Sequence, residues 1–299
     1  MTWICDEVKQ LDLLLNEYLG TTKLIKDVKT KKISQPGENY GSIMYSLDVT
    51  VEDKQNKHEE TIHTVAKVLP QGELIRQIFN IQTTYKNEMA FYKVIVPTML
   101  YFQKELDIQK PIDCFAKCYA VRKNLLENSD VIDDDAVLLL ENLKTAGFIN
   151  IDKVKGFDLE TAEMVLRSLA QFHGISLALK IKKPEVFEKK IKMHCDDYYI
   201  AVGEMPLMVP TIQLLLNENE EIKEQILPKV VGWEGAKRIP KESIFNTLVH
   251  DDLWTNNTMQ KFKNGKPVEN KLVDFQIIAY GSPARDLFFF YGLAFLWLS

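Results

Sequence analysis

Polar and apolar residues alternate along much of the first half of the chain. From Ile43 to Val51 the odd positions are apolar and the even ones mostly polar, which is typical of a half-buried strand. A polar stretch follows and leads into a second predicted strand at 61–69. Apolar runs predict further strands at 114–122 and 137–143. Helical spacing instead appears in two stretches. The first, within 11–30, predicts a short helix that leads into Lys23–Lys32, and the second covers 72–95. The first half therefore predicts a small antiparallel sheet with helices.

The second half has mainly helical periodicity. Asp158 is a suitable N-cap for a helix at 159–180, and two more helices are predicted at 185–203 and 210–227. A hairpin is predicted after them, with the turn Asn264-Gly265-Lys266 between strands 257–262 and 270–275. We therefore expect an α+β fold, with the sheet first and the helices after it.

Composition excludes several classes of function. The chain has 299 residues, of which 46% are hydrophobic and 26% charged, as in globular proteins. A formal net charge of −5 gives no basic field for nucleic acid. The first nine residues have neither signal-peptide nor anchor character. Four scattered cysteines suit a reducing compartment. We expect a cytoplasmic protein that binds no nucleic acid, inserts in no membrane and needs no obligate protein partner.

The C-terminal residues 287–299 are nearly all apolar or aromatic. The run is too short to span a membrane. A helix drawn through it is apolar on every side, which predicts that it needs packing partners on every side. Since the sequence ends there, we expect a truncated C-terminal part that exposes apolar surface and favours self-association.

The strongest chemical signal is the segment His250-Asp251-Asp252-Leu253-Trp254-Thr255-Asn256-Asn257, followed by Val273-Asp274-Phe275. Phosphoryl transfer depends on positioning and charge neutralisation more than on covalent chemistry. One carboxylate must orient the acceptor hydroxyl and take its proton, which is the role predicted for Asp252. An amide and a second carboxylate must hold Mg²⁺ on the ATP phosphates, as predicted for Asn257 and Asp274. The alternative interpretation is a solvated polar loop.

Three upstream features fit the same chemistry by their order and spacing. A loop at 36–42, which includes Asn39, has two glycines and precedes a strand. Its backbone amides can cover phosphates, although an ordinary turn is the alternative. Lys67 on the second strand can meet the α- and β-phosphates, unless it is simply solvated. Glu88, on a helical segment, can pair with Lys67, or be a surface glutamate.

A connector is predicted where the strand at 137–143 ends. Backbone groups around Glu141 and Leu143 can hydrogen-bond an adenine edge, although a plain core strand and turn would have the same sequence. The connector divides the chain into a nucleotide-binding lobe at 1–143 and a catalytic and acceptor lobe at 144–299.

The sequence resembles the ecdysteroid kinase-like family of insects, within the choline kinase and aminoglycoside phosphotransferase group. The resemblance covers nearly the whole chain and is carried by Leu138 to Leu143, Gly147-Phe148, Leu169 to His173, His250 to Asn257, Val273 to Gln276 and Tyr280 to Leu287. It implies a bilobal, protein kinase-like fold and an ATP- and Mg²⁺-dependent kinase acting on a small-molecule alcohol, an ecdysteroid-type steroid.

The resemblance also implies residue roles. Asp252 is implied as the catalytic carboxylate, Asn257 and Asp274 as Mg²⁺ ligands, and Lys67 and Glu88 as the phosphate-binding pair. Asp286 is implied as a structural brace of the catalytic loop, whereas His173 is expected to be a packed core histidine.

Two departures from the family pattern bear on these roles. Asp251 stands where the family usually has glycine or another small or polar residue, and its charge can raise the pKa of a neighbouring carboxylate. Family members also carry further helices after the Asp286 region. Two other functions stay open: a choline or ethanolamine kinase, or a non-catalytic nucleotide-binding or interaction protein. A protein kinase is disfavoured, because Asp274-Phe275-Gln276 replaces Asp-Phe-Gly.

Overall fold

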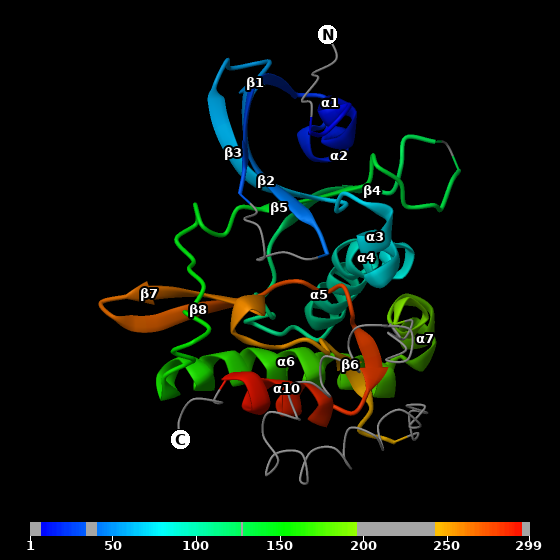
Figure 1. The fold of residues 1–299 in the computed structure, drawn as a ribbon, viewed down its shortest axis with the longest axis vertical. Helices are drawn as coiled ribbons and strands as arrows, with labels where there is room; N and C mark the ends of the chain where they lie inside the picture. Colours follow the sequence, from blue (N-terminus) through cyan, green and yellow to red (C-terminus); the bar gives the residue numbers. More distant parts are fainter. Residues whose placement is uncertain (1–6, 34–40, 127, 196–242, 295–299) are drawn as a thin grey trace.

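The computed structural model describes residues 7–33, 41–126, 128–195 and 243–294. A five-stranded antiparallel sheet forms the upper part of Figure 1, in the order β1-β2-β3-β5-β4. Its strands are β1 (Lys23–Lys32), β2 (Ile43–Asp53), β3 (Glu59–Val68), β4 (Cys118–Arg122) and β5 (Val137–Glu141). The predicted antiparallel sheet is confirmed, with an additional strand, β1, where the sequence suggested only the end of a helix.

Alternation along β2 places its apolar side chains on one face. Leu47, Val49 and Val51 are fully buried, while the polar residues between them are only half-buried. The short helices α1 (Leu11–Leu14) and α2 (Asn16–Leu19) cover this face, and Leu11 and Leu15 join the same core. This packing fixes the register of the sheet, since a shift by one residue would expose every buried side chain.

The helical stretch predicted at 72–95 is interrupted. It consists of α3 (Glu73–Ile78), α4 (Ile81–Ala90) and a π-helical segment Phe91–Ile95, which continues into α5 (Val96–Glu105). Asn80 has a φ of 42°, so the chain turns between α3 and α4. Leu74, Ile75 and Ile78 on α3 are exposed, contrary to the single apolar face that the sequence suggested. Only α4 and the segments after it bury their apolar side against the rest of the protein.

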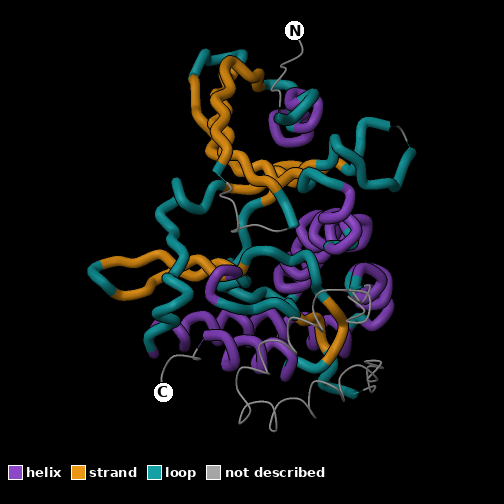
Figure 2. Tube along the Cα trace, viewed as in Figure 1, coloured by secondary structure: helices purple, strands orange, loops and turns teal. Residues whose placement is uncertain are grey.

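The second half contains the long helix α6 (Leu159–Lys182), α7 (Pro184–Lys190) and α10 (Ala284–Ala294). The predicted cap is confirmed, because Asp158 accepts a hydrogen bond from the Thr161 N–H over 2.8 Å. The remainder of the helix predicted at 185–203, from residue 196 on, and the helix predicted at 210–227 lie outside the described residues. Figure 2 shows these helices below the sheet, on the other side of α4 and α5.

Two small antiparallel pairs belong to the second half of the chain. One joins β6 (Thr247–Val249) to β9 (Ala279–Gly281), and the other is a hairpin of β7 (Thr258–Lys263) with β8 (Lys266–Leu272). The hairpin and its turn are as predicted, but its second strand begins and ends earlier than the predicted 270–275, so Asp274 lies after the strand and not on it. The hairpin turn has φ values of 53° at Asn264 and 76° at Gly265, which suits these two residue types. A 3₁₀ turn, Thr255–Asn257, leads directly into β7. The segment between β6 and β9 therefore carries all three of the acidic and amide residues predicted to act in catalysis.

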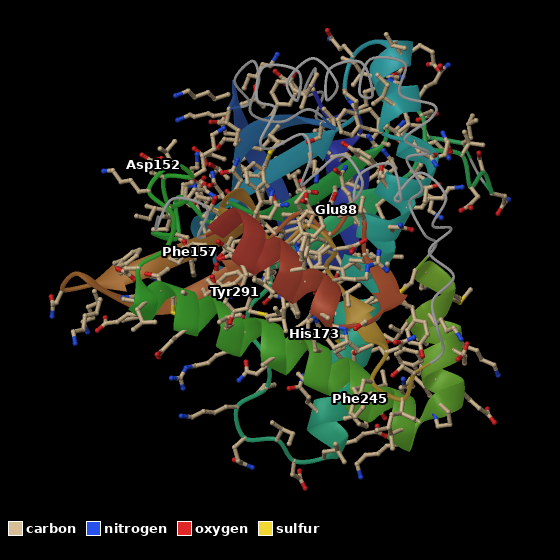
Figure 3. All side chains as sticks on the ribbon, turned by 60° about the horizontal axis from the view of Figure 1, so that its bottom comes forward. Glu88, Asp152, Phe157, His173, Phe245 and Tyr291 are labelled. Atoms are coloured by element: carbon tan, nitrogen blue, oxygen red, sulfur yellow. The ribbon has the colours of Figure 1, made fainter. Side chains whose placement is uncertain are left out.

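The C-terminal apolar run begins on α10, which lies along α6 in Figure 3. Phe290 is fully buried and stacks on Phe157, with ring centroids 5.7 Å apart. In contrast, 79% of Phe288 and 57% of Tyr291 is exposed. Only one side of this helix is thus covered by described residues. Among the helices that the structure describes, none has the length and apolar character needed to cross a bilayer.

Candidate active site

Lys67 stands at the centre of a network of buried charges. It lies on β3, directly opposite Leu138 of β5, and is 5% exposed. Its Nζ atom donates to Glu88 Oε2 over 2.7 Å and to Asp274 Oδ1 over 2.9 Å. The structure therefore brings together three of the predicted site residues from β3, α4 and the segment after β8.

Burial and pairing act against each other on these charges. Burial raises the pKa of Glu88 to about 7, against the opposing effect of Lys67. Burial alone would lower the pKa of Lys67, but the nearby carboxylates of Asp274 and Glu88 outweigh it and raise the pKa. Lys67 is thus held as a cation in the interior, where removing its partners would leave a buried charge uncompensated.

Asp252 and Asn257 form a second pair. The Asn257 amide nitrogen Nδ2 donates to Asp252 Oδ2 over 2.8 Å and to the Asp252 carbonyl over 2.9 Å. Both amide hydrogens are therefore used, and the amide oxygen of Asn257 remains to accept or to bind a cation. Burial, followed by the charge of Asp274, raises the pKa of Asp252 to about 7. A carboxyl group with this pKa is suited to accept a proton near neutral pH.

Asp251 does not point an unpaired charge at Asp252. Its carboxylate pairs with the Arg285 guanidinium, through Nε at 2.7 Å and through a second nitrogen. Asp251 has a φ of 65°, a left-handed conformation that glycine adopts freely and aspartate tolerates. This explains why a small or polar residue suits the position. The expected like-charge effect on Asp252 is present, but it is smaller than those of burial and Asp274.

Asp286 holds the backbone of the loop that carries Asp252. Its Oδ1 accepts from the Asp251 N–H over 2.6 Å, and its Oδ2 accepts from the His250 N–H over 2.9 Å. His173 Nε2 also bonds Oδ2, over 2.7 Å. Asp286 is fully buried at the first turn of α10. His173 thus belongs to this bracing network, a contact that the interpretation as a packed core histidine missed.

Asp274 and Asn257 are brought close by the backbone. The Val273 N–H donates to the Asn257 carbonyl over 3.0 Å. The next residue, Asp274, has a φ of 67°, so the chain turns sharply there. Phe275 then enters a buried aromatic cluster and stacks on Phe91, with centroids 3.6 Å apart and planes at 10°. The cluster anchors the chain immediately after Asp274.

These residues surround a cleft with a volume of about 530 Å³. It lies between the sheet and the β7–β8 region, and Lys67, Glu88, Asn257 and Asp274 all line it. Apolar side chains complete the wall: Ile33, Met44, Val65, Ala116, Leu140, Leu143, Met259 and Val273. Asp252 is outside this lining and reaches the cleft through its bond to Asn257. The cleft has charged groups at one place and apolar walls elsewhere, as small-molecule sites commonly do.

The connector residues also reach the cleft, in different ways. Leu143 lines it, and its N–H takes part in none of the hydrogen bonds found among the described residues. Glu141 lines it as well, but its N–H already donates to the Lys117 carbonyl over 2.8 Å, and its carboxylate accepts from the Lys117 N–H over 3.3 Å. Asn142 fixes the turn, since its side chain accepts from Lys144 N–H over 3.2 Å and donates to Ser46 Oγ over 3.1 Å. Asn39 lies outside the described residues.

The donor set suits a hard cation. The carboxylate of Asp274 and the amide oxygen of Asn257 are oxygen ligands of the kind that Mg²⁺ prefers. Within residues 7–33, 41–126, 128–195 and 243–294, no cluster of three or more histidine, cysteine or acidic side chains could hold a metal alone.

Sequence patterns gave no sign of several residues at the mouth of the cleft. They lie in the loop after β5 and beside Asn257: Lys144, Asn150, Asp152, Lys153 and Asn256. Asp152 marks this loop in Figure 3. Isolated polar residues in a loop have no period and no motif spacing, so only the folded chain reveals that they face the same cleft.

Solved structures share the fold. A GDP and kanamycin complex of an aminoglycoside phosphotransferase aligns with a TM-score of 0.50 at 11% identity, covering 95% of this chain and 78% of that one. The GDP complex of wild-type aminoglycoside 2'-phosphotransferase-IIIa aligns with a TM-score of 0.46 at 11% identity, covering 95% and 77%. The predicted fold, an antiparallel-sheet lobe with a helical lobe in the protein kinase-like arrangement, is confirmed.

Sequence comparison identifies the family. A search of curated proteins gave no match. The sequence model of the ecdysteroid kinase-like family, however, matches residues 36–294 and so includes every described residue of the cleft wall after Ile33. This confirms the resemblance seen in the motifs. The chain belongs to the ecdysteroid kinase-like family and is a phosphotransferase of the small-molecule kinase type.

Proposed function

We propose that the protein transfers the γ-phosphoryl group of ATP, with Mg²⁺, to the hydroxyl of an ecdysteroid-type steroid alcohol. The observation that carries the proposal is the meeting of Lys67, Glu88 and Asp274 in one cleft, beside the Asp252–Asn257 pair. A buried lysine between two carboxylates is costly to maintain. Its retention at the charged part of the cleft is well explained by a role in holding phosphates.

Residues 1–143 would hold the nucleotide in this proposal. The adenine would lie between the apolar walls of the cleft, with its edge against the connector, where the Leu143 N–H is available as a donor. Lys67 would contact the α- and β-phosphates, with Glu88 holding it in place. The loop containing Asn39 is proposed to cover the phosphates. The GDP in the aminoglycoside phosphotransferase complex with kanamycin supports a nucleotide in this cleft.

Residues 144–299 would supply the catalytic groups. Asp252 would orient the acceptor hydroxyl and take its proton, while its bond to Asn257 keeps the carboxylate aimed. Asn257 and Asp274 would hold Mg²⁺, which neutralises phosphate charge when bound. Asp286 would keep Asp252 in position, because it accepts hydrogen bonds from the N–H groups of the two preceding residues, His250 and Asp251.

The acceptor is proposed from the family resemblance, because the proposal assigns the described cleft to the nucleotide. A steroid needs a large apolar site with few polar groups, whereas choline needs aromatic faces and carboxylates around its quaternary ammonium. We propose the steroid first and choline or ethanolamine second. We also propose a cytoplasmic setting, which rests on the four scattered cysteines of the sequence.

Turnover of ATP by purified protein tests the proposal. A panel of ecdysteroids, choline, ethanolamine and aminoglycosides is offered, with and without Mg²⁺, and the phosphorylated product is detected by mass spectrometry. We expect Mg²⁺-dependent phosphorylation of an ecdysteroid. Phosphorylation of choline alone would favour the second acceptor, and absence of ATP binding would favour a non-catalytic protein.

A further inference from the structure

The loop between β5 and α6 is attached to the turn that carries Asn257. Ile149 and Gln260 exchange two backbone hydrogen bonds, each of 2.8 Å. The next residue, Asn150, donates from Nδ2 to the Asn256 carbonyl over 3.3 Å and to the Thr258 carbonyl over 3.1 Å. In Figure 1 the green segment after β5 passes beside β7 and β8, as these bonds require. Both amide hydrogens of Asn150 are therefore committed to the chain around Asn257.

The two carbonyls that Asn150 binds lie on either side of Asn257. The carbonyl of Asn257 itself accepts from the Val273 N–H over 3.0 Å. Three consecutive peptide carbonyls, at 256, 257 and 258, are thus held by donors from outside the turn. Fixing the peptide planes around a residue restricts the direction of its side chain, which decides where the Asn257 amide oxygen points.

We propose that Asn150 is a positioning residue, which aims the amide oxygen of Asn257 at Mg²⁺ by fixing the peptides around it. The inference rests on the proposed function, since it takes Asn257 as a metal ligand. It also gives a reason for the hydrogen bonds between this loop and β7. The loop follows the connector, which would contact the nucleotide base, so these bonds would keep the metal-binding turn at a fixed position relative to that base.

Asn150 can be changed without disturbing the core beneath the turn. The layer below consists of buried polar side chains, in which Gln260 Nε2 donates to Thr258 Oγ1 over 2.8 Å and to Asn270 Oδ1 over 3.1 Å. Gln260 is fully buried, whereas Asn150 is an exposed residue. Substituting Asn150 therefore removes two hydrogen bonds and opens no cavity.

The test uses Asn150→Asp, which keeps the size of the side chain but replaces the donor with an oxygen that repels both carbonyls. Ile149→Ala is the matched control, because that side chain is 52% exposed and its backbone bonds would remain. Hydrogen exchange of residues 251–259 in the metal-free protein reports the turn. Calorimetry measures ATP binding with Mg²⁺ and ADP binding without it.

For Asn150→Asp we expect the hydrogen-exchange rate of residues 251–259 to rise roughly three- to tenfold, because two hydrogen bonds are lost. The Mg²⁺-dependent affinity for ATP should fall by a similar factor. ADP binding without Mg²⁺ and exchange in α6 should stay within about twofold of wild type. Ile149→Ala should behave as wild type throughout.

Three results would overturn the inference. The first is unchanged exchange and Mg²⁺ dependence in Asn150→Asp. The second is an equal loss of Mg²⁺-free ADP binding, which would make Asn150 a nucleotide contact. The third is a general rise of exchange that includes α6, which would make its role structural. A wild-type protein without Mg²⁺-dependent ATP binding would refute the proposed function itself, and is recognised before any variant is compared.

Discussion

The rings of Phe91 and Phe275 stack face to face, with centroids 3.6 Å apart. Phe91 follows the helix that carries Glu88, and Phe275 follows Asp274. The stacking therefore joins the backbones of the two carboxylates that bind Lys67. Phe115, Phe172 and His250 surround the Phe275 ring, which makes it the centre of the aromatic cluster.

Replacing Phe275 with alanine should destabilise the protein by about 3–5 kcal/mol, since a fully buried aromatic ring would leave a cavity. Phe288→Ala is the matched control, because 79% of Phe288 is exposed, and it should change stability by less than about 0.5 kcal/mol. Urea unfolding measures both. Equal losses in the two variants would contradict the described packing.

Asp252→Asn should lower turnover by roughly a factor of 10²–10⁴, the usual contribution of a general base. ATP affinity should change little, because Asp252 lies outside the lining of the cleft. Steady-state kinetics and calorimetry on the same preparation separate the two effects. A variant that keeps wild-type turnover would show that Asp252 is not the base.

Asp274→Ala should abolish the Mg²⁺-dependent part of ATP binding, because it removes a carboxylate oxygen from the metal site. Lys67→Met should weaken ATP binding less, by removing one point charge. It should also be tolerated in the fold, since Glu88, with its pKa of about 7, can take up a proton once its partner is gone. Calorimetry with and without Mg²⁺ checks this. Indistinguishable binding by wild type and Asp274→Ala would refute the metal assignment.

Stability should fall below about pH 6.5 because of His250. Burial lowers the pKa of this fully buried imidazole from 6.5. Nε2 donates to the Val273 carbonyl, and Nδ1 has no partner among the described residues. As the pH falls below 6.5, the unfolded chain binds a proton that the folded protein does not, so this contribution to stability is lost.

Comparing wild type with His250→Gln isolates that contribution. The raised pKa values of Glu88 and Asp252 act in the opposite direction in this range, but both proteins share them. Between pH 7.5 and 5.5, wild type should lose up to about 1.4 kcal/mol more unfolding free energy than the variant. Urea titrations at the two pH values measure it. A larger loss in the variant would reverse the assigned sign.

The fold was predictable where one physical pattern dominates. The alternation in β2 and the cap at Asp158 both specify local structure, and both predictions are confirmed. The strand β1 was missed because Lys23–Lys32 consists largely of lysines and exposed polar residues. Its place in the sheet comes from pairing with β2, which no local pattern encodes. Likewise, the break at Asn80 depends on one left-handed residue within an apparently continuous helix.

In the candidate site, motif residues were predictable and supporting residues were not. Asp252, Asn257 and Asp274 have diagnostic spacing, and the structure brings them near Lys67 and Glu88, although their roles remain proposals. The partners of His173 and Asn150 depend on contacts across more than a hundred positions. Nothing within reach of either residue along the sequence signals such a contact, so only the tertiary structure supplies it.

Lys67 and Asp274 bond each other although they are 207 positions apart in the sequence, so the ribosome makes them at different times. Glu88 is only 21 positions from Lys67, and the last strand of the sheet ends at Glu141. A growing chain can therefore close the sheet and pair Lys67 with Glu88 long before Asp274 leaves the ribosome. At about 5–20 residues per second, the second carboxylate arrives roughly 10–40 s after Lys67. During that interval the nascent protein would hold the Lys67–Glu88 ion pair without Asp274, so the proposed binding of Mg²⁺ and ATP would begin only after Asp274 has emerged.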